Sequence, residues 1–190
     1  YPGNSMDQVK WVGTIGADYG VIAVAGDSDV VTLGELLENL KNKPRKWVIG
    51  GGSAVGGWDH LKVLMAAKEY GISNVRKIKY VSFDGGGDAV TQLLAGNVQI
   101  FTGDVSEIKG FVDAGDIKII AVLSPDRLPG DFSKFYTAKE QGVNVVGANW
   151  RGFYVPKGMS DDAYNFWAGA IKKMYDTPQW KKTMAKNGLA

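Results

Sequence analysis

Short apolar runs alternate with helical patterns along most of the chain, and this alternation predicts an α/β fold. The continuous apolar runs at 21–25 and 117–123 are typical of strands covered on both faces of a sheet. Apolar residues 61, 64 and 65 recur at helical spacing within 61–70, and Gly71 predicts the end of that helix. Strands that alternate with helices favour a mostly parallel sheet flanked by helices.

Capping signals predict the ends of further elements. Thr32 and Glu35 match a capping box, which predicts a helix through about residue 42, and Pro44 prevents its continuation. Thr137 and Glu140 match a second capping box on a very short helix. The other expected strands and helices are 46–49, 76–81, 89–95, 98–102, 107–114, 143–146, 150–155, a helix capped by Ser160 and a last helix from Pro178. Residues 1–20 are weakly patterned.

The first of two glycine-rich turns lies between the apolar run 46–49 and the helical pattern 61–70. Because it holds five glycines and one serine, its backbone N–H groups can approach a ligand closely. At a helix N-terminus the helix dipole favours negative charge, so the turn predicts an anion cradle. The expected donors are Gly52, Ser53, Ala54, Val55, Gly56 and Gly57. A flexible glycine turn without any ligand is the alternative.

Sharper nucleotide or catalytic motifs do not fit this turn. The dinucleotide fingerprint requires glycine where Val55 stands, and the P-loop motif requires a Lys-Ser/Thr pair that is absent. A nucleophile elbow would need glycine two residues after Ser53, which is again Val55. No cofactor is therefore expected.

A second glycine turn, at 82–88, has the same position between an expected strand and an expected helix. Asp84 or Asp88 could cap that helix. Two such turns at the carboxyl ends of strands in one sheet point at a single crevice, which makes a small-anion site the leading hypothesis. The candidate ligand-binding residues here are Phe83, Asp84, Gly85, Gly86 and Gly87.

Four further side chains are candidates for the same crevice. His60 lies in the first helical turn, although packing or a hydrogen bond between the loop and a neighbour is the preferred role for it. Asp104 follows another strand and, with Glu107, could bind an ammonium group; capping the helix that Ser106 opens is the preferred role. Trp150 lies at the presumed hinge, where it lines a cleft or only packs the crossing strands.

Composition excludes several classes of function. The chain has 190 residues, 45% hydrophobic and 22% charged, which is ordinary for a soluble globular protein. Its net charge of +2 includes no basic run of the kind that follows a nucleic acid. With no cysteine and one histidine, the chain has no disulfide and little basis for a metal site. No apolar stretch is long enough to span a bilayer, and no signal peptide opens the sequence.

A series of short motifs resembles the receptors of tripartite tricarboxylate transporters, the TctC or Bug family. In the family's order these motifs are 49–53 with Gly57 and 59–60, then 80–87, 93–98, 106–107, 114–118, 127–130, 139–142, 149–152 and 156–161. Each motif is weak, and their shared order over residues 21–188 carries the resemblance.

The resemblance implies a type II periplasmic-binding-protein fold, in which two α/β domains joined by crossing strands close on a ligand. It implies that residues 1–23 are partial domain one and hinge, 24–149 are the ligand-binding domain two, and 150–190 are hinge and partial domain one. The family's long N-terminal part and further C-terminal helices are not in this sequence, so we expect a fragment with half of the ligand site.

The function implied by the resemblance is periplasmic capture of a small carboxylate, such as citrate, a dicarboxylate, an acidic amino acid or an aromatic acid. The receptor would deliver this ligand to a membrane permease without being membrane-embedded itself, and without catalysis. One alternative is a ligand-sensing signalling module of the same fold. A hydrolase that uses Ser53 and His60 is a second, although no known triad order is met.

Overall fold

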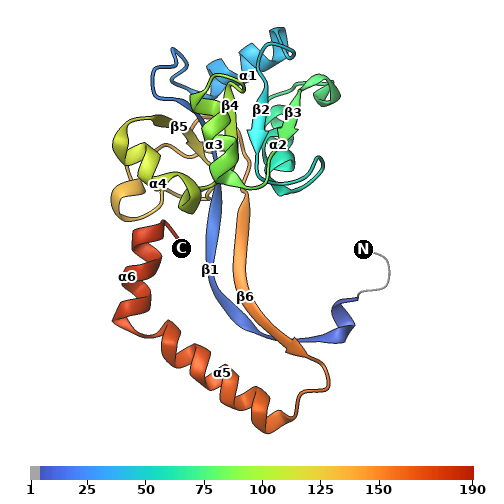
Figure 1. The fold of residues 1–190 in the computed structure, drawn as a ribbon, viewed down its shortest axis with the longest axis vertical. Helices are drawn as coiled ribbons and strands as arrows, with labels where there is room; N and C mark the ends of the chain where they lie inside the picture. Colours follow the sequence, from blue (N-terminus) through green and yellow to red (C-terminus); the bar gives the residue numbers. More distant parts are fainter. Residues whose placement is uncertain (1–4) are drawn as a thin grey trace.

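The computed structural model describes residues 5–190, which form an α/β unit and a long two-stranded ribbon that carries two helices (Figure 1). The helices are α1 (Leu33–Asn42), α2 (Trp58–Glu69), α3 (Gly86–Leu94), α4 (Val105–Ala114), α5 (Asp161–Tyr175) and α6 (Pro178–Asn187). The strands are β1 (Val9–Ala25), β2 (Ile49–Gly51), β3 (Tyr80–Ser82), β4 (Ile100–Asp104), β5 (Ile117–Val122) and β6 (Ala148–Pro156). Single 3-10 turns are η1 (Met6–Gln8), η2 (Val75–Lys77) and η3 (Gly130–Phe132).

The sheet of the α/β unit has the strand order β3-β2-β4-β1-β5. β2 is parallel to both β3 and β4, while β1 is antiparallel to β4 and to β5. Four strands therefore run in one direction, and β1 runs against them. The expected mostly parallel sheet flanked by helices is confirmed, with β1 as its antiparallel member.

Two hydrophobic clusters cover the two faces of this sheet. Successive side chains of β1 point to opposite faces, so Ile22 packs under α1 and α2 while Val21 packs under α3 and α4. Leu37 and Phe101 are fully buried representatives of the two clusters. This two-sided burial explains why 21–25 reads as one continuous apolar run.

β1 is much longer than the sequence pattern predicts. Only 21–25 was expected as strand, but the strand begins at Val9 and its first half pairs with β6 from Val9↔Pro156 to Tyr19↔Ala148. Two register shifts, near Gly13 and Gly16, break the alternation of the side chains. Because the ribbon also lacks one consistently buried face, its residues have no clear period of two.

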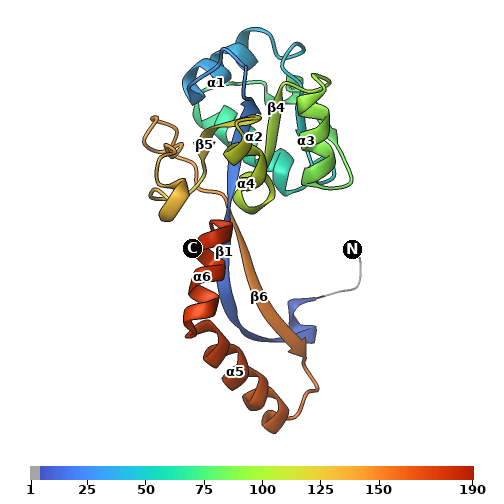
Figure 2. The same cartoon turned by 60° about the vertical axis from the view of Figure 1, so that its left-hand side comes forward.

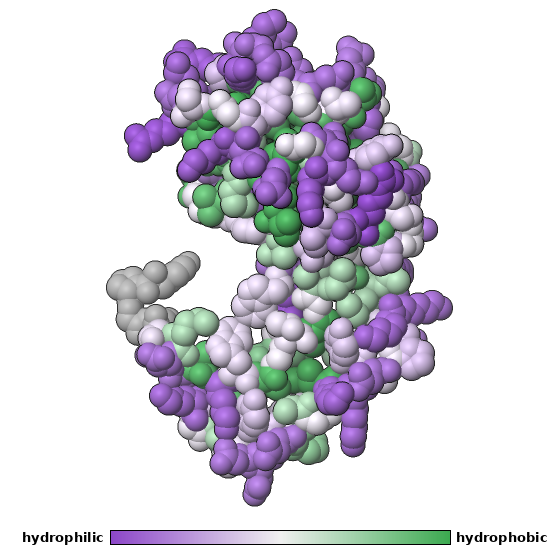
Figure 3. Space-filling model, turned by 180° about the vertical axis from the view of Figure 1, so that it is seen from behind, coloured by the Kyte–Doolittle hydropathy of each residue, from purple (hydrophilic) through white to green (hydrophobic). Residues whose placement is uncertain are grey.

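Helices α5 and α6 lie along the ribbon (Figure 2). The Tyr164 hydroxyl donates to the carbonyl of Trp11 at 2.8 Å, and the Trp180 indole N–H donates to the carbonyl of Ile15 at 3.3 Å. The backbone of Ala190 exchanges two hydrogen bonds with Ala17, of 2.6 and 3.0 Å. Figure 3 shows hydrophobic surface in this lower part of the molecule and a hollow beside the ribbon.

Four expected local features are wrong. The expected strand 76–81 begins only at Tyr80, because Val75–Lys77 form the 3-10 turn η2. The expected strand 46–49 begins only at Ile49, since Lys46 lies in a turn and Trp47 in a bend, and it continues through Gly50 and Gly51. Residues 143–146 form no strand. The capping box of Thr137 and Glu140 is present, with hydrogen bonds of 2.8 and 3.0 Å, but it closes a turn and not a helix.

No helix among residues 5–190 combines the length and the apolar character that a membrane crossing requires.

Candidate functional site

The structure brings the two glycine turns into direct contact. They follow β2 and β3, which are adjacent and parallel, so both turns emerge at the same edge of the sheet. A Cβ atom added to Gly52 would lie 2.7 Å from the Cα of Gly85 and 2.7 Å from the nitrogen of Gly86. The backbones thus touch at a distance that only glycine at residue 52 permits.

Side chains hold the first turn in shape. The Ser53 hydroxyl accepts from the backbone N–H of Asp59 at 2.9 Å, and Nδ1 of His60 accepts from the N–H of Gly56 at 3.0 Å. The Tyr80 hydroxyl donates to the Ser53 carbonyl at 2.7 Å. These hydrogen bonds between side chains and backbone groups therefore fix the shape of the turn without any ligand.

Two of the N–H groups that the sequence assigns to an anion are already bonded within this turn. The N–H of Gly56 is held by His60, and that of Gly57 donates to the Ala54 carbonyl at 2.7 Å. Among residues 5–190, the N–H groups of Ala54 and Val55 have no hydrogen-bond acceptor, and both residues are exposed. The free donors of the first turn are thus at its tip.

His60 is a structural group of this turn. Its ring stacks on Tyr80 with centroids 4.5 Å apart, and burial lowers the pKa of the imidazole. A neutral ring suits the acceptor role of Nδ1 towards Gly56. Within the described residues, Ser53 and His60 form no hydrogen bond with each other, so the pairing that a hydrolase needs is absent.

The second turn is open. Gly85 has a φ of 128°, which favours glycine, and it caps α3 without any side-chain hydrogen bond. The expected capping by Asp84 or Asp88 is therefore wrong. In the part of the chain that the structure describes, the N–H groups of Gly86 and Gly87 have no protein acceptor, which leaves the first N–H groups of α3 available to a ligand.

Phe83 points away from this edge. Its ring packs against the hydrophobic cluster under α3 and α4, and a Cβ on Gly50 would lie 3.1 Å from it. Asp84, the next residue, is exposed. Phe83 therefore anchors the turn to the core, while the glycines after it face the edge.

A buried lysine lies beneath the first turn. Lys62 of α2 is 0% exposed, and its ammonium group contacts Asp59 and Asp104 carboxylate oxygens at 2.8 Å each and the Gly103 carbonyl at 2.6 Å. It ties α2 to the end of β4. Such a group is stable in the interior only because it is paired.

The sequence pattern missed Lys62 because the apolar residues that predict α2 do not mark its buried face. Leu61 and Met65, whose spacing predicted the helix, are 43% and 36% exposed. The buried stripe is Asp59, Lys62, Val63, Ala66 and Ala67. The i, i+3 spacing of Asp59 and Lys62 was the available signal, since such pairs meet on one side of a helix.

Asp104 connects this cluster to the ribbon. Its second carboxylate oxygen accepts from the Asn149 amide at 2.7 Å and lies 3.5 Å from the Arg151 guanidinium. Its backbone N–H donates to the Glu107 carboxylate at 2.8 Å, as the preferred capping role predicts. Asp104 is 4% exposed, so it supports the site from below and does not face an incoming ligand.

Asp18 of β1 completes the network. It accepts from the Ser106 hydroxyl at 2.6 Å and lies 3.4 Å from Arg151. Burial raises the pKa of Asp18, and the negative charge of Asp104 raises it further. The hydrogen bonds from Ser106 and the charge of Arg151 lower this pKa and oppose the effect of burial. Burial also raises the pKa of Glu107, whose carboxylate end lies close to Gly86 and Gly103 although the residue is partly exposed.

Trp150 lies on the ribbon and not among the glycine turns. It pairs with Ala17 across the two strands, and its ring meets Trp11 edge-on at 5.3 Å. Strand alternation places it on the face opposite Asn149 and Arg151. Half of its surface is exposed.

Among residues 5–190, no group of three His, Cys, Asp or Glu side chains is arranged to hold a metal ion.

A sequence model of one family, described as the tripartite tricarboxylate transporter family receptor (TctC), matches residues 2–190. The chain belongs to the TctC family. This match confirms the family resemblance from which the fold was predicted. The family is one of receptors and not of enzymes.

Curated relatives agree with this assignment. The chain is 24% identical over 171 residues to a UPF0065 protein of Cupriavidus necator, covering 90% of this chain and 50% of the relative. It is 23% identical over 185 residues to a UPF0065 protein of Bordetella pertussis, covering 97% and 55%. The chain therefore spans about half the length of the curated relatives it matches.

Solved structures show the shared fold. A TctC solute binding protein from Polaromonas matches with a TM-score of 0.75 at 24% identity, covering 98% of this chain and 62% of that one. An adipate-bound R. palustris protein gives 0.84 at 21%, covering 96% and 59%. MatC from Rhodopseudomonas palustris with bound malate gives 0.82 at 16%, covering 96% and 61%. The periplasmic-binding-protein fold is thus confirmed for this TctC chain.

Proposed function

We propose that this TctC chain is the part of a periplasmic solute receptor that holds one carboxylate of a small dicarboxylate. In this proposal 24–149 form the ligand-binding domain two. Residues 1–23 and 150–190 supply the hinge and part of domain one, with residues 1–4 outside the described residues. The observation that carries the proposal is the contact between the two glycine turns, which aims the N-termini of α2 and α3 at one edge of the sheet.

The donors proposed for the carboxylate are the backbone N–H groups at the tip of the first turn and at the start of α3. They have no acceptor among the described residues, and helix dipoles favour an anion at both helix starts. Each charge-assisted hydrogen bond contributes about 1.5–3 kcal/mol. Ser53, His60, Tyr80 and Lys62 hold the turn in position and do not contact the ligand.

The dicarboxylate class is supported by the titles of two related structures, which name adipate and malate. Both ligands carry a carboxylate at each end. Asp104 is already bonded to Lys62 and Asn149, so an ammonium group would find no free carboxylate there. This favours a dicarboxylate over an acidic amino acid.

We also propose that the receptor delivers its ligand to a membrane permease, which is supported by the family description of a transporter receptor. We propose that the ligand closes the crevice between the glycine turns of domain two and domain one, with β1 and β6 as the crossing strands. The closed receptor then presents its ligand to the permease from the periplasmic side.

An amide-shift NMR titration tests the site. The ligands are adipate, malate, glutamate and benzoate, and the control is 1,6-hexanediol, which has the length of adipate but no charge. We expect the shifts to concentrate at 53–58 and 85–88, to be largest for the two dicarboxylates, and to be absent with the diol. The absence of shifts with millimolar adipate and malate, or shifts that concentrate elsewhere, would overturn the proposed site.

A further inference from the structure

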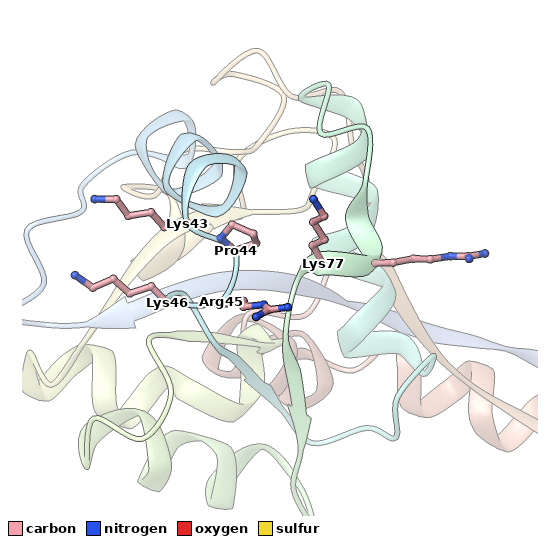
Figure 4. A pocket seen from close by; sticks show the side chains of 6 residues that line it. Lys43, Pro44, Arg45, Lys46 and Lys77 are labelled. Carbon is pink, nitrogen blue, oxygen red and sulfur yellow. The ribbon is translucent and has the colours of Figure 1, made fainter.

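A pocket lined almost entirely by cations lies at the far end of the α/β unit from the glycine turns. It has a volume of about 740 Å³ and is lined by Lys43, Pro44, Arg45, Lys46, Arg76 and Lys77. Figure 4 shows Lys43 and Lys46 extending from the segment after α1, and Lys77 rising from η2 on the other side. The fold thus joins two short basic segments that are separate in the sequence.

The positive charge of this pocket is not neutralised by the protein. All five cationic side chains are exposed, and among residues 5–190 none of them lies within 4.0 Å of a carboxylate. Some other cationic side chains do pair with a carboxylate, as Lys109 does with Asp113 at 2.7 Å. The local charge is therefore far more positive than the net charge of +2 of the whole chain implies.

The pocket and the proposed ligand site lie at opposite edges of the sheet. Lys46 and Lys77 precede the first residues of β2 and β3, whereas the glycine turns follow the last residues of the same strands. β2 (Ile49–Gly51) and β3 (Tyr80–Ser82) therefore lie between the pocket and the glycine turns. The pocket is therefore open to a partner while the other edge holds a ligand.

We propose that this cationic pocket is a docking site for an acidic polypeptide segment of a partner protein. The five exposed cationic side chains lie around one pocket, with Lys43 and Lys46 extending outward in Figure 4, and together they match a row of carboxylates. The Arg45 and Arg76 side chains can each bind a carboxylate through two hydrogen bonds. The inference does not depend on the identity of the ligand at the glycine turns.

The shape and composition favour a polypeptide over an anionic bilayer. A concave pocket accepts a protruding chain, whereas a bilayer presents a broad surface. The lining holds no large apolar side chain that could insert between lipids, Pro44 being its only uncharged member. Binding should therefore be electrostatic and should weaken with salt.

The test uses fluorescein-labelled deca-glutamate and fluorescence anisotropy at low ionic strength. In the pocket variant, Lys43→Gln, Arg45→Gln, Arg76→Gln and Lys77→Gln are combined. The matched control combines Lys139→Gln, Lys157→Gln, Lys173→Gln and Lys182→Gln, four exposed lysines that form no ion pair in the described structure. Each variant loses four positive charges, so the two proteins have the same net charge.

We expect the pocket variant to bind the peptide at least about tenfold more weakly than the wild type, and the control to stay within about twofold. The charge-preserving double variant Lys43→Arg/Lys77→Arg should also stay within about twofold, which guards against misfolding as the cause. No wild-type binding, or an equal loss in the pocket and control variants, would overturn the proposal. Pocket-dependent binding to phosphatidylcholine–phosphatidylglycerol vesicles without binding to the peptide would overturn it too, in favour of a membrane surface.

Discussion

The two glycine turns have the same place in the fold but are stabilised in different ways. The first is held by hydrogen bonds of three side chains, Ser53, His60 and Tyr80. The second has no side-chain cap, and its shape comes from the positive φ of Gly85 and from contact with the first turn. Removing side chains should therefore damage the first turn, whereas adding a side chain at the contact should damage both.

The largest difference should come from Lys62, which anchors the helix after the first turn and has no counterpart under α3. Lys62→Met leaves the Asp59 carboxylate without its cation and leaves Asp104 with only the more distant Arg151 guanidinium at 3.5 Å. We expect a loss of about 3–5 kcal/mol in the free energy of unfolding, measured in urea. Lys68→Met, at an exposed position of the same helix, is the control and should change it by less than about 0.5 kcal/mol. Similar values for both would show that the buried cluster is not needed.

The contact between the turns can be broken with one methyl group. In Gly52→Ala the new Cβ would meet the backbone of Gly85 and Gly86 at 2.6–2.7 Å, and we expect a loss of about 1–3 kcal/mol on thermal or urea unfolding. Gly87→Ala, where nothing lies within 4 Å, should be neutral or stabilise α3 by up to about 1 kcal/mol. If the two alanines behaved alike, the turns would not be in backbone contact.

The capping side chain should matter only in the first turn. Ser53→Ala removes the acceptor for the Asp59 N–H, which should cost about 1 kcal/mol of unfolding free energy. Asp84→Ala removes an exposed side chain that caps nothing and should change stability by less than about 0.5 kcal/mol. An equal or larger effect of Asp84→Ala would mean that the second turn is capped after all.

The smallest effect is the pH dependence contributed by His60. Burial lowers its pKa in the folded protein below the ordinary value of 6.5, so the unfolded chain binds a proton more readily. The contribution of His60 to the free energy of unfolding is therefore fully present above about pH 6.5 and is lost progressively as the pH falls below that value. The measurement compares unfolding free energies of the wild type and His60→Gln at pH 7.5 and pH 5.5. The wild type should lose more than the variant on acidification; an equal loss would contradict the assignment.

Sequence could predict both glycine turns, because runs of glycine between an apolar run and a helical pattern are local signals. It could predict that they share an edge, since parallel strands end together. It could not predict which N–H groups stay free, because His60 and Tyr80 reach the first turn through packing that no spacing reveals. Asp104 was placed at the right edge, but its depth in the cluster was not visible from the chain.

Other features depended on long-range contacts. Lys62 reads as a surface residue because lysine is seldom buried, and its carboxylate partner Asp104 lies 42 residues away. The first half of β1 lacks a period of two, since bulges interrupt it near Gly13 and Gly16. The cationic pocket forms from 43–46 and 76–77, neither of which is a long basic run.

The position of β1 also determines the order in which the chain can fold. β1 begins at Val9, but every strand that pairs with it comes much later: β4 at Ile100–Asp104, β5 at Ile117–Val122 and β6 at Ala148–Pro156. The second half of β1 therefore stays unpaired until residues 100–104 have been synthesised, and the ribbon half, which pairs with residues 148–156, waits longest. Closing such long loops should make folding slow for a chain of this size and should leave the nascent protein open to chaperones.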